Sequence, residues 1–164
     1  MLHSFTGALS DGSSPFAPVV IGSGGVLYGT TSGNGASDGG TVFCLTPPAS
    51  LGGPWTEDVL YSFTGFSDGY IPIAPVVIGN GGVLCGSNTS GAFGYGTVFS
   101  LVPPASPGVP WTENVLYTFT GCSDGRAPEG GLLIGRGGVL YGTTALGGAK
   151  SCDGGFGTVF ALRP

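Results

Sequence analysis

The residues of this chain best suited to chemistry are three aspartates that recur in one short sequence. Asp11, Asp68 and Asp124 each stand in a Ser-Asp-Gly triplet. Such carboxylates could bind Ca²⁺, or act as acid and base on a glycan. Ser-Asp-Gly is also a favourable turn, in which Asp bonds its own backbone and Gly takes a positive φ. Because the dense Asp-x-Asp-x-Asp pattern of strong calcium loops is lacking, we expect no obligatory cofactor and keep Ca²⁺ as an alternative.

Further polar and aromatic side chains fall in the loops expected beside these triplets. A ring, a carboxylate and a guanidinium together could hold a sugar. The candidate ligand-binding residues, in addition to the three repeated aspartates, are Asp38, Asp153, Tyr70, Tyr95 and Arg126. The alternative is that Tyr95, together with Phe93, packs beneath its own loop.

Nucleophilic catalysis and zinc chemistry find little support in the sequence. His3 is the one histidine of the chain, and it aligns with Tyr61 and Tyr117 of the later copies. Zinc sites built on several histidines are therefore excluded, and a Ser-His-Asp triad would depend on this one imidazole. We assign no catalytic residue and no metal ligand.

The four cysteines divide into two groups. Cys44 and Cys85 occupy expected strand positions and are interpreted as small buried apolar residues. Cys122 and Cys152 stand in two loops that we expect at the same end of one repeat. A disulfide between them and two free thiols are both open.

The elements that must position these residues come from an internal repeat. The segment GGVLYGTT at residue 24 returns at residue 137, and GGVLCGSN stands at residue 81. The copies start 57 and 56 residues apart. A repeated unit of about this length typically forms a propeller blade or a solenoid repeat, because one copy cannot bury its apolar face alone. The chain is one domain, 1–164, with approximate repeats at 1–57, 58–113 and 114–164.

Each repeat contains four short strand-like runs, which in the second copy are residues 75–78, 83–86, 96–101 and 111–120. The first run is wholly apolar, as in an innermost strand, and the last carries Glu113, as in a charged edge strand. The pattern predicts an all-β chain: a β-propeller of four-stranded antiparallel blades, three per chain.

The repeated motifs are Phe-Thr-Gly, Asp-Gly, Gly-x-Leu-Tyr-Gly-Thr-Thr and Gly-Thr-Val-Phe. This pattern resembles, over essentially the whole chain, the tandem repeats named after Gloeobacter and Verrucomicrobia, found in bacterial proteins often labelled choice-of-anchor. The resemblance implies surface or secreted proteins with propeller-like repeats, and it brings no established catalytic residues. Copy two departs from the pattern at Cys85, Ser87 and Asn88, and copy three at Gly131.

The order of the runs leaves the ring open. Residues 1–7 correspond to a fourth strand, and the chain stops after the third strand of its last blade. We expect the N-terminal strand to close the last blade of a partner chain, which gives a six-bladed homodimer. The alternatives are a head-to-tail filament subunit and an excised fragment of a longer surface repeat protein.

The net charge of the chain limits the classes of partner that it can bind. Four Lys and Arg against nine Asp and Glu give a net charge of −5, which argues against nucleic acid. No apolar run approaches the roughly 20 residues of a membrane span, and no signal segment is visible.

We therefore expect a non-enzymatic extracellular or cell-surface scaffold that binds a glycan or a surface protein and self-assembles by strand exchange. The alternative is a carboxylate-dependent glycoside hydrolase or lyase acting at the ring mouth.

Overall fold

The computed structural model describes residues 1–91, 93–106, 108–148 and 155–164 of the chain. Its strands are β1 (Val20–Ile21), β2 (Leu27–Thr31), β3 (Thr41–Thr46), β4 (Thr56–Ser62), β5 (Val77–Ile78), β6 (Leu84–Asn88), β7 (Thr97–Val102), β8 (Thr112–Thr118), β9 (Leu133–Ile134), β10 (Leu140–Thr144) and β11 (Thr158–Leu162). They form three antiparallel sheets, ordered β1-β2-β3-β4, β5-β6-β7-β8 and β9-β10-β11. The all-β prediction and the order from first to fourth strand are confirmed.

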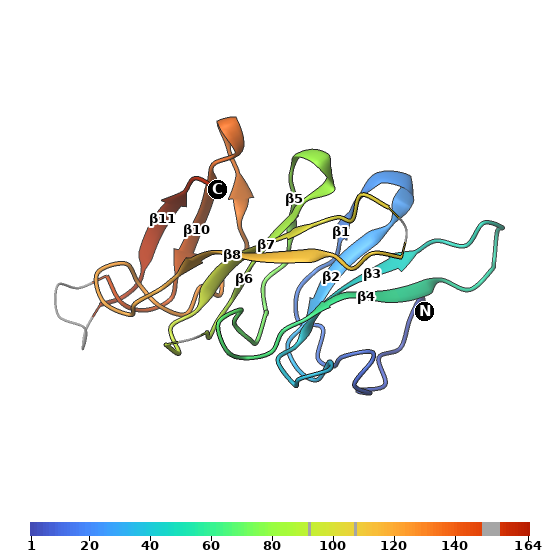
Figure 1. Cartoon of the computed structure of the whole chain (residues 1–164), viewed down its shortest axis with the longest axis horizontal. Helices are drawn as coiled ribbons and strands as arrows, with labels where there is room; N and C mark the ends of the chain where they lie inside the picture. The colour runs from blue at the N-terminus through green and yellow to red at the C-terminus, as the bar shows by residue number, and fades with distance from the viewer. Residues whose placement is uncertain (92, 107, 149–154) are drawn as a thin grey trace.

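The three sheets follow one another along the longest axis of the molecule (Figure 1). At one end of the sheets, three short 3₁₀ turns connect the first strand of each sheet to the second: Ser23–Gly25, Asn80–Gly82 and Arg136–Gly138. At the opposite end the longer loops gather. There an isolated bridge joins Tyr70 to Ser90, and another joins Arg126 to Leu146. The loops after Ser-Asp-Gly and the loops after the second strands therefore share one end, as the sequence predicted.

A glycine and a phenylalanine explain why two of the repeated motifs occur together. In the register of the sheets, Gly86 of Leu-Cys-Gly-Ser stands opposite Phe99 of Gly-Thr-Val-Phe. A Cβ on Gly86 would lie 2.5 Å from the Phe99 ring. Gly29 and Phe43, and Gly142 and Phe160, repeat the pair in the other sheets with the same spacing. The ring lies over the bare backbone of its cross-strand partner, so each motif requires the other.

We expect Gly86→Ala to lower the free energy of unfolding by roughly 1 to 2 kcal/mol, because the new methyl group forces the Phe99 ring to move in a packed core. Urea denaturation followed by circular dichroism measures the change. Gly79→Ala is the matched control, since its Cβ would meet no atom closer than 3.5 Å. Equal destabilisation by both variants would contradict this explanation.

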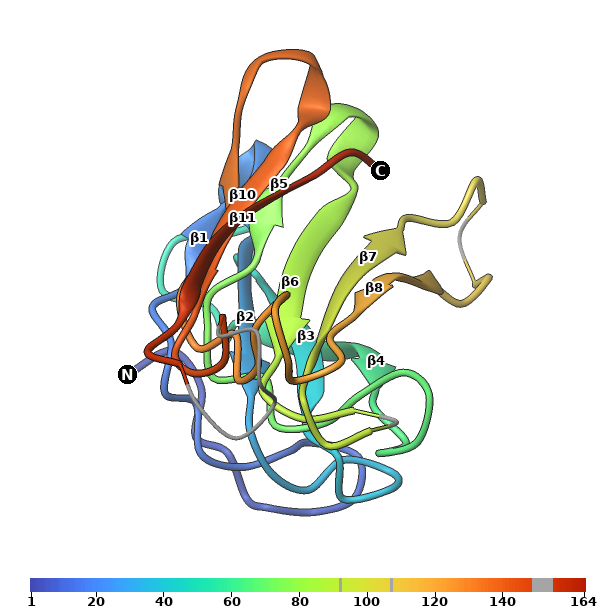
Figure 2. The same cartoon turned by 90° about the vertical axis from the view of Figure 1, so that its left-hand side faces the viewer.

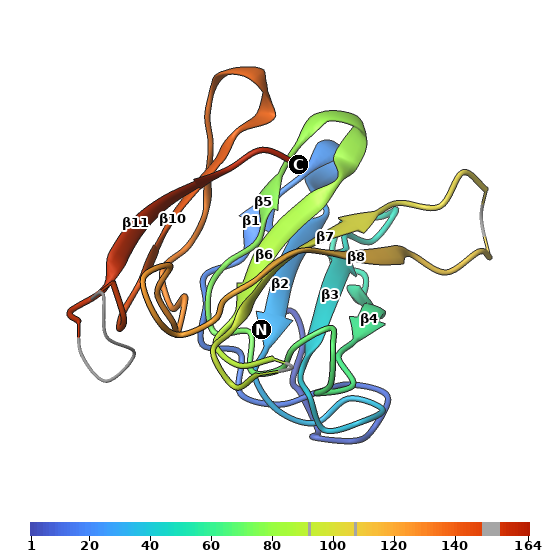
Figure 3. The same cartoon turned by 60° about the vertical axis from the view of Figure 1, so that its left-hand side comes forward.

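The core lies between the sheets. One cluster joins Val42 of β3 to Leu84, Phe99 and Leu101 of the second sheet, with Phe63 between them. A second cluster places Val98 and Cys85 of the second sheet, with Phe119, against Leu132 and Leu140 at the third sheet. In each case the residue directly after the fourth strand is a phenylalanine that packs in the cluster with the next sheet. Figure 3 shows the chain crossing from β8 towards β10 and β11. Neighbouring copies thus cover one another's apolar faces.

The N-terminal segment lies against the first sheet. Phe5 contacts Phe43 of β3, with ring centroids 5.0 Å apart. This matches the contact of Phe63 with Phe99 at 4.9 Å and of Phe119 with Phe160 at 5.2 Å. Within the described residues, 1–7 pair with no strand and the third sheet has three strands. Closure by a partner chain stays a prediction.

Candidate functional site

Each repeated aspartate holds the turn that follows the fourth strand. Asp68 accepts hydrogen bonds from the backbone N–H and the hydroxyl of Thr64, at 2.8 and 2.7 Å. The hydroxyl of Tyr61 donates a third bond at 3.1 Å. The carboxylate therefore ties β4, the Phe-Thr-Gly turn and the Ser-Asp-Gly turn together, and its strong acceptor capacity is used within the protein.

The same arrangement recurs at the other two copies. Asp124 accepts bonds from the N–H and the hydroxyl of Thr120, at 2.8 and 2.7 Å, and from the hydroxyl of Tyr117 at 3.0 Å. Asp11 accepts bonds from the N–H and hydroxyl of Thr6, and His3 takes the tyrosine's place, with Nε2 at 3.3 Å from the carboxylate. A histidine that looked isolated in the sequence is thus the first-copy member of a repeated contact.

Burial and hydrogen bonding act in opposite directions on these acids. Burial by itself would raise the pKa of Asp11, but the bonds from Thr6, together with His3, outweigh it and lower that pKa. Asp124 behaves alike: burial opposes ionisation, and the bonds from Thr120 and Tyr117 lower its pKa overall. Both groups are therefore held as carboxylates by their own turns.

Two glutamates of the fourth strands, which the sequence indicates only as edge charges, lie near these turns. Burial, with the charge of Asp68 nearby, raises the pKa of Glu113 to about 7. Burial likewise raises the pKa of Glu57, where Asp11 adds to the effect and His3 opposes it. Oε1 of each glutamate is buried without a hydrogen-bond partner in the described part of the chain.

The position of these glutamates is repeated in the sequence, but the repetition alone does not show that they are buried. Trp-Thr-Glu opens the fourth run in two copies, at residues 55 and 111. The repetition indicates a required position, but an acid at a sheet edge also protects that edge. The structure makes β4 and β8 the outer strands of their sheets, yet turns Glu57 and Glu113 towards the preceding acid turn.

A shallow hollow at the loop end brings two of the predicted ligand-binding residues together. Asp38 and Tyr70 line a depression of about 280 Å³, together with Ser37, Gly39 and Gly65. Asp38 comes from the loop after β2, whereas Tyr70 follows the Ser-Asp-Gly turn of the next repeat. Asp38 is exposed, and its Oδ1 accepts one bond, from the N–H of Asn34 at 3.1 Å. The hollow therefore offers, beside an aromatic ring, a carboxylate oxygen to which the described residues donate no hydrogen bond.

The corresponding place between the second and third repeats has a different surface. Tyr95 packs in the second core cluster, and its ring lies over Gly121, where a Cβ would be 2.6 Å away. Arg126 occupies the position of Tyr70, and its Nε is buried without a partner among the described residues. Tyr95 therefore packs under its loop, the alternative that the sequence left open.

Within the described residues, no group of three or more His, Cys, Asp or Glu side chains could hold a metal ion. The three repeated aspartates lie in separate turns, each with its own threonine. Their role in binding an ion or a sugar stays a prediction.

A family model described as the Gloeobacter/Verrucomicrobia repeat matches residues 1–164, the whole of the chain in which these three equivalent turns were found. The chain belongs to the Gloeobacter/Verrucomicrobia repeat family. A search of curated proteins found no match. The recognition made from the motifs is thus confirmed.

Two predicted features of this Gloeobacter/Verrucomicrobia repeat chain lie outside the described residues. Asp153 and Cys152 belong to the segment 149–154, so a ligand-binding role of Asp153 stays a prediction. The disulfide between Cys122 and Cys152, which the sequence left open beside two free thiols, also falls on this segment. Cys44 and Cys85 are buried, and burial raises the pKa of both thiols. In the part of this repeat chain that is described, no helix has the length and apolar character needed to cross a bilayer.

Proposed function

We propose that this chain is a non-enzymatic scaffold, exported to the cell surface or the medium, that binds a glycan at its loop end. The observation that carries the proposal is the hollow between Asp38 and Tyr70. A tyrosine ring supplies an apolar face for a sugar ring, and an exposed carboxylate accepts bonds from sugar hydroxyls. Sheets on both sides fix the two loops that present them.

The buried state of two of the three repeated acids, Asp11 and Asp68, favours binding over hydrolysis. A glycosidase needs two carboxyl groups that flank the bond to be cleaved. Asp68 is 5% exposed and Asp11 is 7% exposed, and the oxygens of both accept bonds from the protein itself. A substrate would have to displace these bonds to reach either group, so we do not propose the hydrolase or lyase alternative.

A glycan array, followed by calorimetry with the strongest soluble oligosaccharide, tests the proposal. We expect Tyr70→Ala to weaken binding by roughly tenfold or more, which corresponds to about 1.4 kcal/mol, and Asp38→Asn to weaken it less. Tyr141→Ala, which removes a partly exposed tyrosine of β10, is the matched control and should bind as the parent does. Absence of binding across the array, or equal loss in the control, would overturn the proposal.

The same titration tests the alternative of Ca²⁺. Measured in Ca²⁺ and in chelator, the affinity of the parent chain should be the same if the hollow acts through hydrogen bonds and ring contact. Loss of affinity in chelator, restored by Ca²⁺, would assign the ion a part in the site. Asp68→Asn then reports whether a repeated aspartate holds that ion or serves its turn alone.

A further inference from the structure

The contact between neighbouring sheets is built in the same way at both junctions of the chain. Val42 of the first sheet and Val98 of the second occupy equivalent positions, and each is 0% exposed because the next sheet covers it. Across the junction, Val76 and Leu132 are the equivalent covering residues, also buried. The two junctions between the sheets are thus two copies of one interface.

Polar contacts repeat along with the apolar ones. The N–H of Phe63 donates to the carbonyl of Gly40, and the N–H of Phe119 donates to that of Gly96, both at 3.0 Å. The hydroxyl of Thr30 donates to the carbonyl of Ala74 across the first junction, at 3.1 Å. The hydroxyl of Ser87 donates to that of Pro128 across the second, at the same distance.

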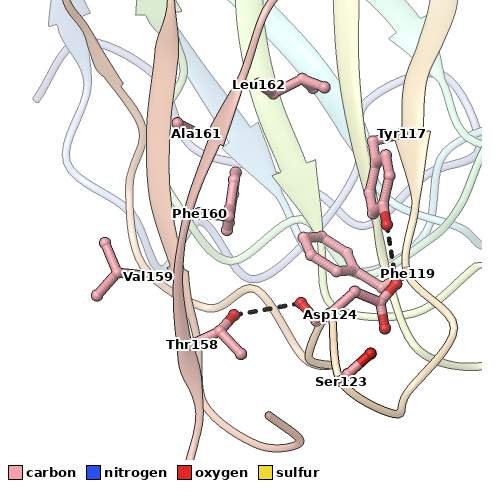
Figure 4. Close-up of a pocket in the computed structure, with 9 residues that line it drawn as sticks. All are labelled: Tyr117, Phe119, Ser123, Asp124, Thr158, Val159, Phe160, Ala161 and Leu162. Atoms are coloured by element: carbon pink, nitrogen blue, oxygen red, sulfur yellow. Dashed lines mark hydrogen bonds between the residues drawn. The ribbon is translucent and has the colours of Figure 1, made fainter.

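The third sheet has the same face, and no described residue covers it. Val159, the counterpart of Val42 and Val98, is 82% exposed. Tyr141 and Leu133 of the same sheet are also exposed, as is Thr143, the counterpart of the hydroxyl donors. Figure 4 shows Phe160 turned towards Phe119, whereas Val159 points to the opposite side of β11. In Figure 2 this outer sheet is the part of the chain turned to the viewer.

The first sheet has the matching opposite face, and the described residues leave its innermost strand exposed. Val19 and Ile21 are the counterparts of Val76 and Ile78, which contact the preceding sheet, and both are exposed. Phe16 is exposed beside them. The N-terminal segment already lies on this sheet as the end of a preceding sheet's outer strand would. Phe5 contacts Phe43 in the way that Phe63 contacts Phe99. The described residues therefore leave two different faces exposed, and the two complement each other.

The free edge of β11 adds a backbone requirement. In the first two sheets the third strand pairs with a fourth: Val42 stands opposite Tyr61, and Val98 opposite Tyr117. No described residue pairs with the outer edge of β11. A groove of about 250 Å³ runs along it, bounded by Tyr117 and Asp124 (Figure 4). An unpaired edge of this kind is a template for a strand of another chain.

We propose that a second copy of this chain docks head to tail on the third sheet and supplies both missing parts. Its residues 2–6 pair with β11, with Ser4 opposite Thr158 and His3 opposite Val159, the register of the two internal pairs. Its Val19 and Ile21 cover Val159. This one placement satisfies the apolar face and the strand edge together, because the N-terminal segment and the first sheet are already held in the required relation.

Two copies joined twice in this way close a ring of six sheets. Propellers have typically about four to eight blades, so six is an ordinary number. Head-to-tail contacts close only when the rotation between units permits it, and otherwise produce a filament. The assembly goes beyond the proposed glycan binding and does not depend on it, because the hollow at Asp38 and Tyr70 lies within one chain.

Sedimentation velocity over a range of protein concentrations, with mass photometry, tests the assembly. We expect a dimer for the parent chain. Val159→Lys should raise the dimer dissociation constant by roughly 100-fold or more, because a charge would enter an apolar junction. Val109→Lys is the matched control: Val109 is an exposed valine in the connector before β8, far from β11, and its variant should remain dimeric.

Ile21→Lys separates head-to-tail docking from a contact between two third sheets. Ile21 lies on the opposite face, so head-to-tail docking predicts that this variant also dissociates. A variant that stayed dimeric would overturn the proposed orientation. A parent chain that is monomeric at every concentration would overturn the proposal as a whole, and a series of growing oligomers would overturn the closed ring. Unchanged circular dichroism spectra establish that the exposed substitutions leave each chain folded.

Discussion

Phe63→Ala is expected to lower the free energy of unfolding by about 3 to 5 kcal/mol, the usual effect of emptying a phenylalanine site in a core. The Phe63 side chain is fully buried between the first and second sheets. Its ring meets Phe99 at 4.9 Å and Tyr61 at 5.2 Å, edge to face in both cases. Removal leaves a cavity at the junction and also separates the acid turn from the core. Equilibrium urea denaturation at a fixed protein concentration measures the change.

Phe66→Ala is the matched control, because Phe66 lies three residues further along the same turn and is 78% exposed. Its variant should unfold within about 0.5 kcal/mol of the parent. If Phe63→Ala and Phe66→Ala were equally stable, the junction between the sheets would not be the main source of stability, and the folded unit would have to be the single sheet.

The second large effect concerns pH. Glu113 has its pKa raised to about 7 by burial, with the charge of Asp68 nearby. The folded state therefore holds this proton more tightly than the unfolded state, whose glutamate titrates near its ordinary value. Linkage then requires the contribution of Glu113 to the free energy of unfolding to fall as the pH rises between about 4.5 and 7. Ionisation in the folded chain costs roughly 2 to 3 kcal/mol, after allowance for partial screening by solvent.

Glu113→Gln removes this titration and mimics the protonated acid. We expect the variant to be about as stable as the parent at pH 4.5, and more stable than the parent at pH 8 by about 2 kcal/mol. Urea denaturation at each pH gives both curves. Glu129→Gln, which removes an exposed acid, should shift the whole curve little and keep its slope. Parallel curves for the parent and Glu113→Gln would show that the glutamate is solvated in the folded chain.

Much of the fold was available from the sequence because it depends on local and repeated signals. The period identified three equivalent units, and the glycines between short apolar runs identified four strands in each of two sheets. Positive φ angles at Gly12, Gly69 and Gly125, which follow the three repeated aspartates, show that these turns were interpreted for the right physical reason. The family was recognisable for the same cause, since its motifs are the residues that build each sheet.

The candidate site was predicted less completely, because a residue's type does not reveal what lies opposite it. Asp68 and Asp38 look alike in the sequence, yet one is enclosed by Thr64 and Tyr61 while the other is exposed beside Tyr70. Tyr95 was a candidate for ligand binding; its ring lies over Gly121, partly buried, and a role in binding stays a prediction. Glu113 was interpreted as an edge charge, and the structure buries it near the charge of Asp68, which only the tertiary contacts reveal.

The sequence by itself determined the strands, their order within a sheet and the equivalence of the three repeats, since these follow from periodicity and backbone preference. Only the tertiary structure decided which acids are buried, which loops meet and which face of the third sheet is uncovered. Burial arises from contacts between residues far apart in the sequence and on neighbouring sheets, such as Phe63 with Phe99 and Val42 with Val76. Val42, Val98 and Val159 stand in the same motif. The first two are 0% exposed because the next sheet packs against them, whereas Val159 is 82% exposed because no described residue covers it.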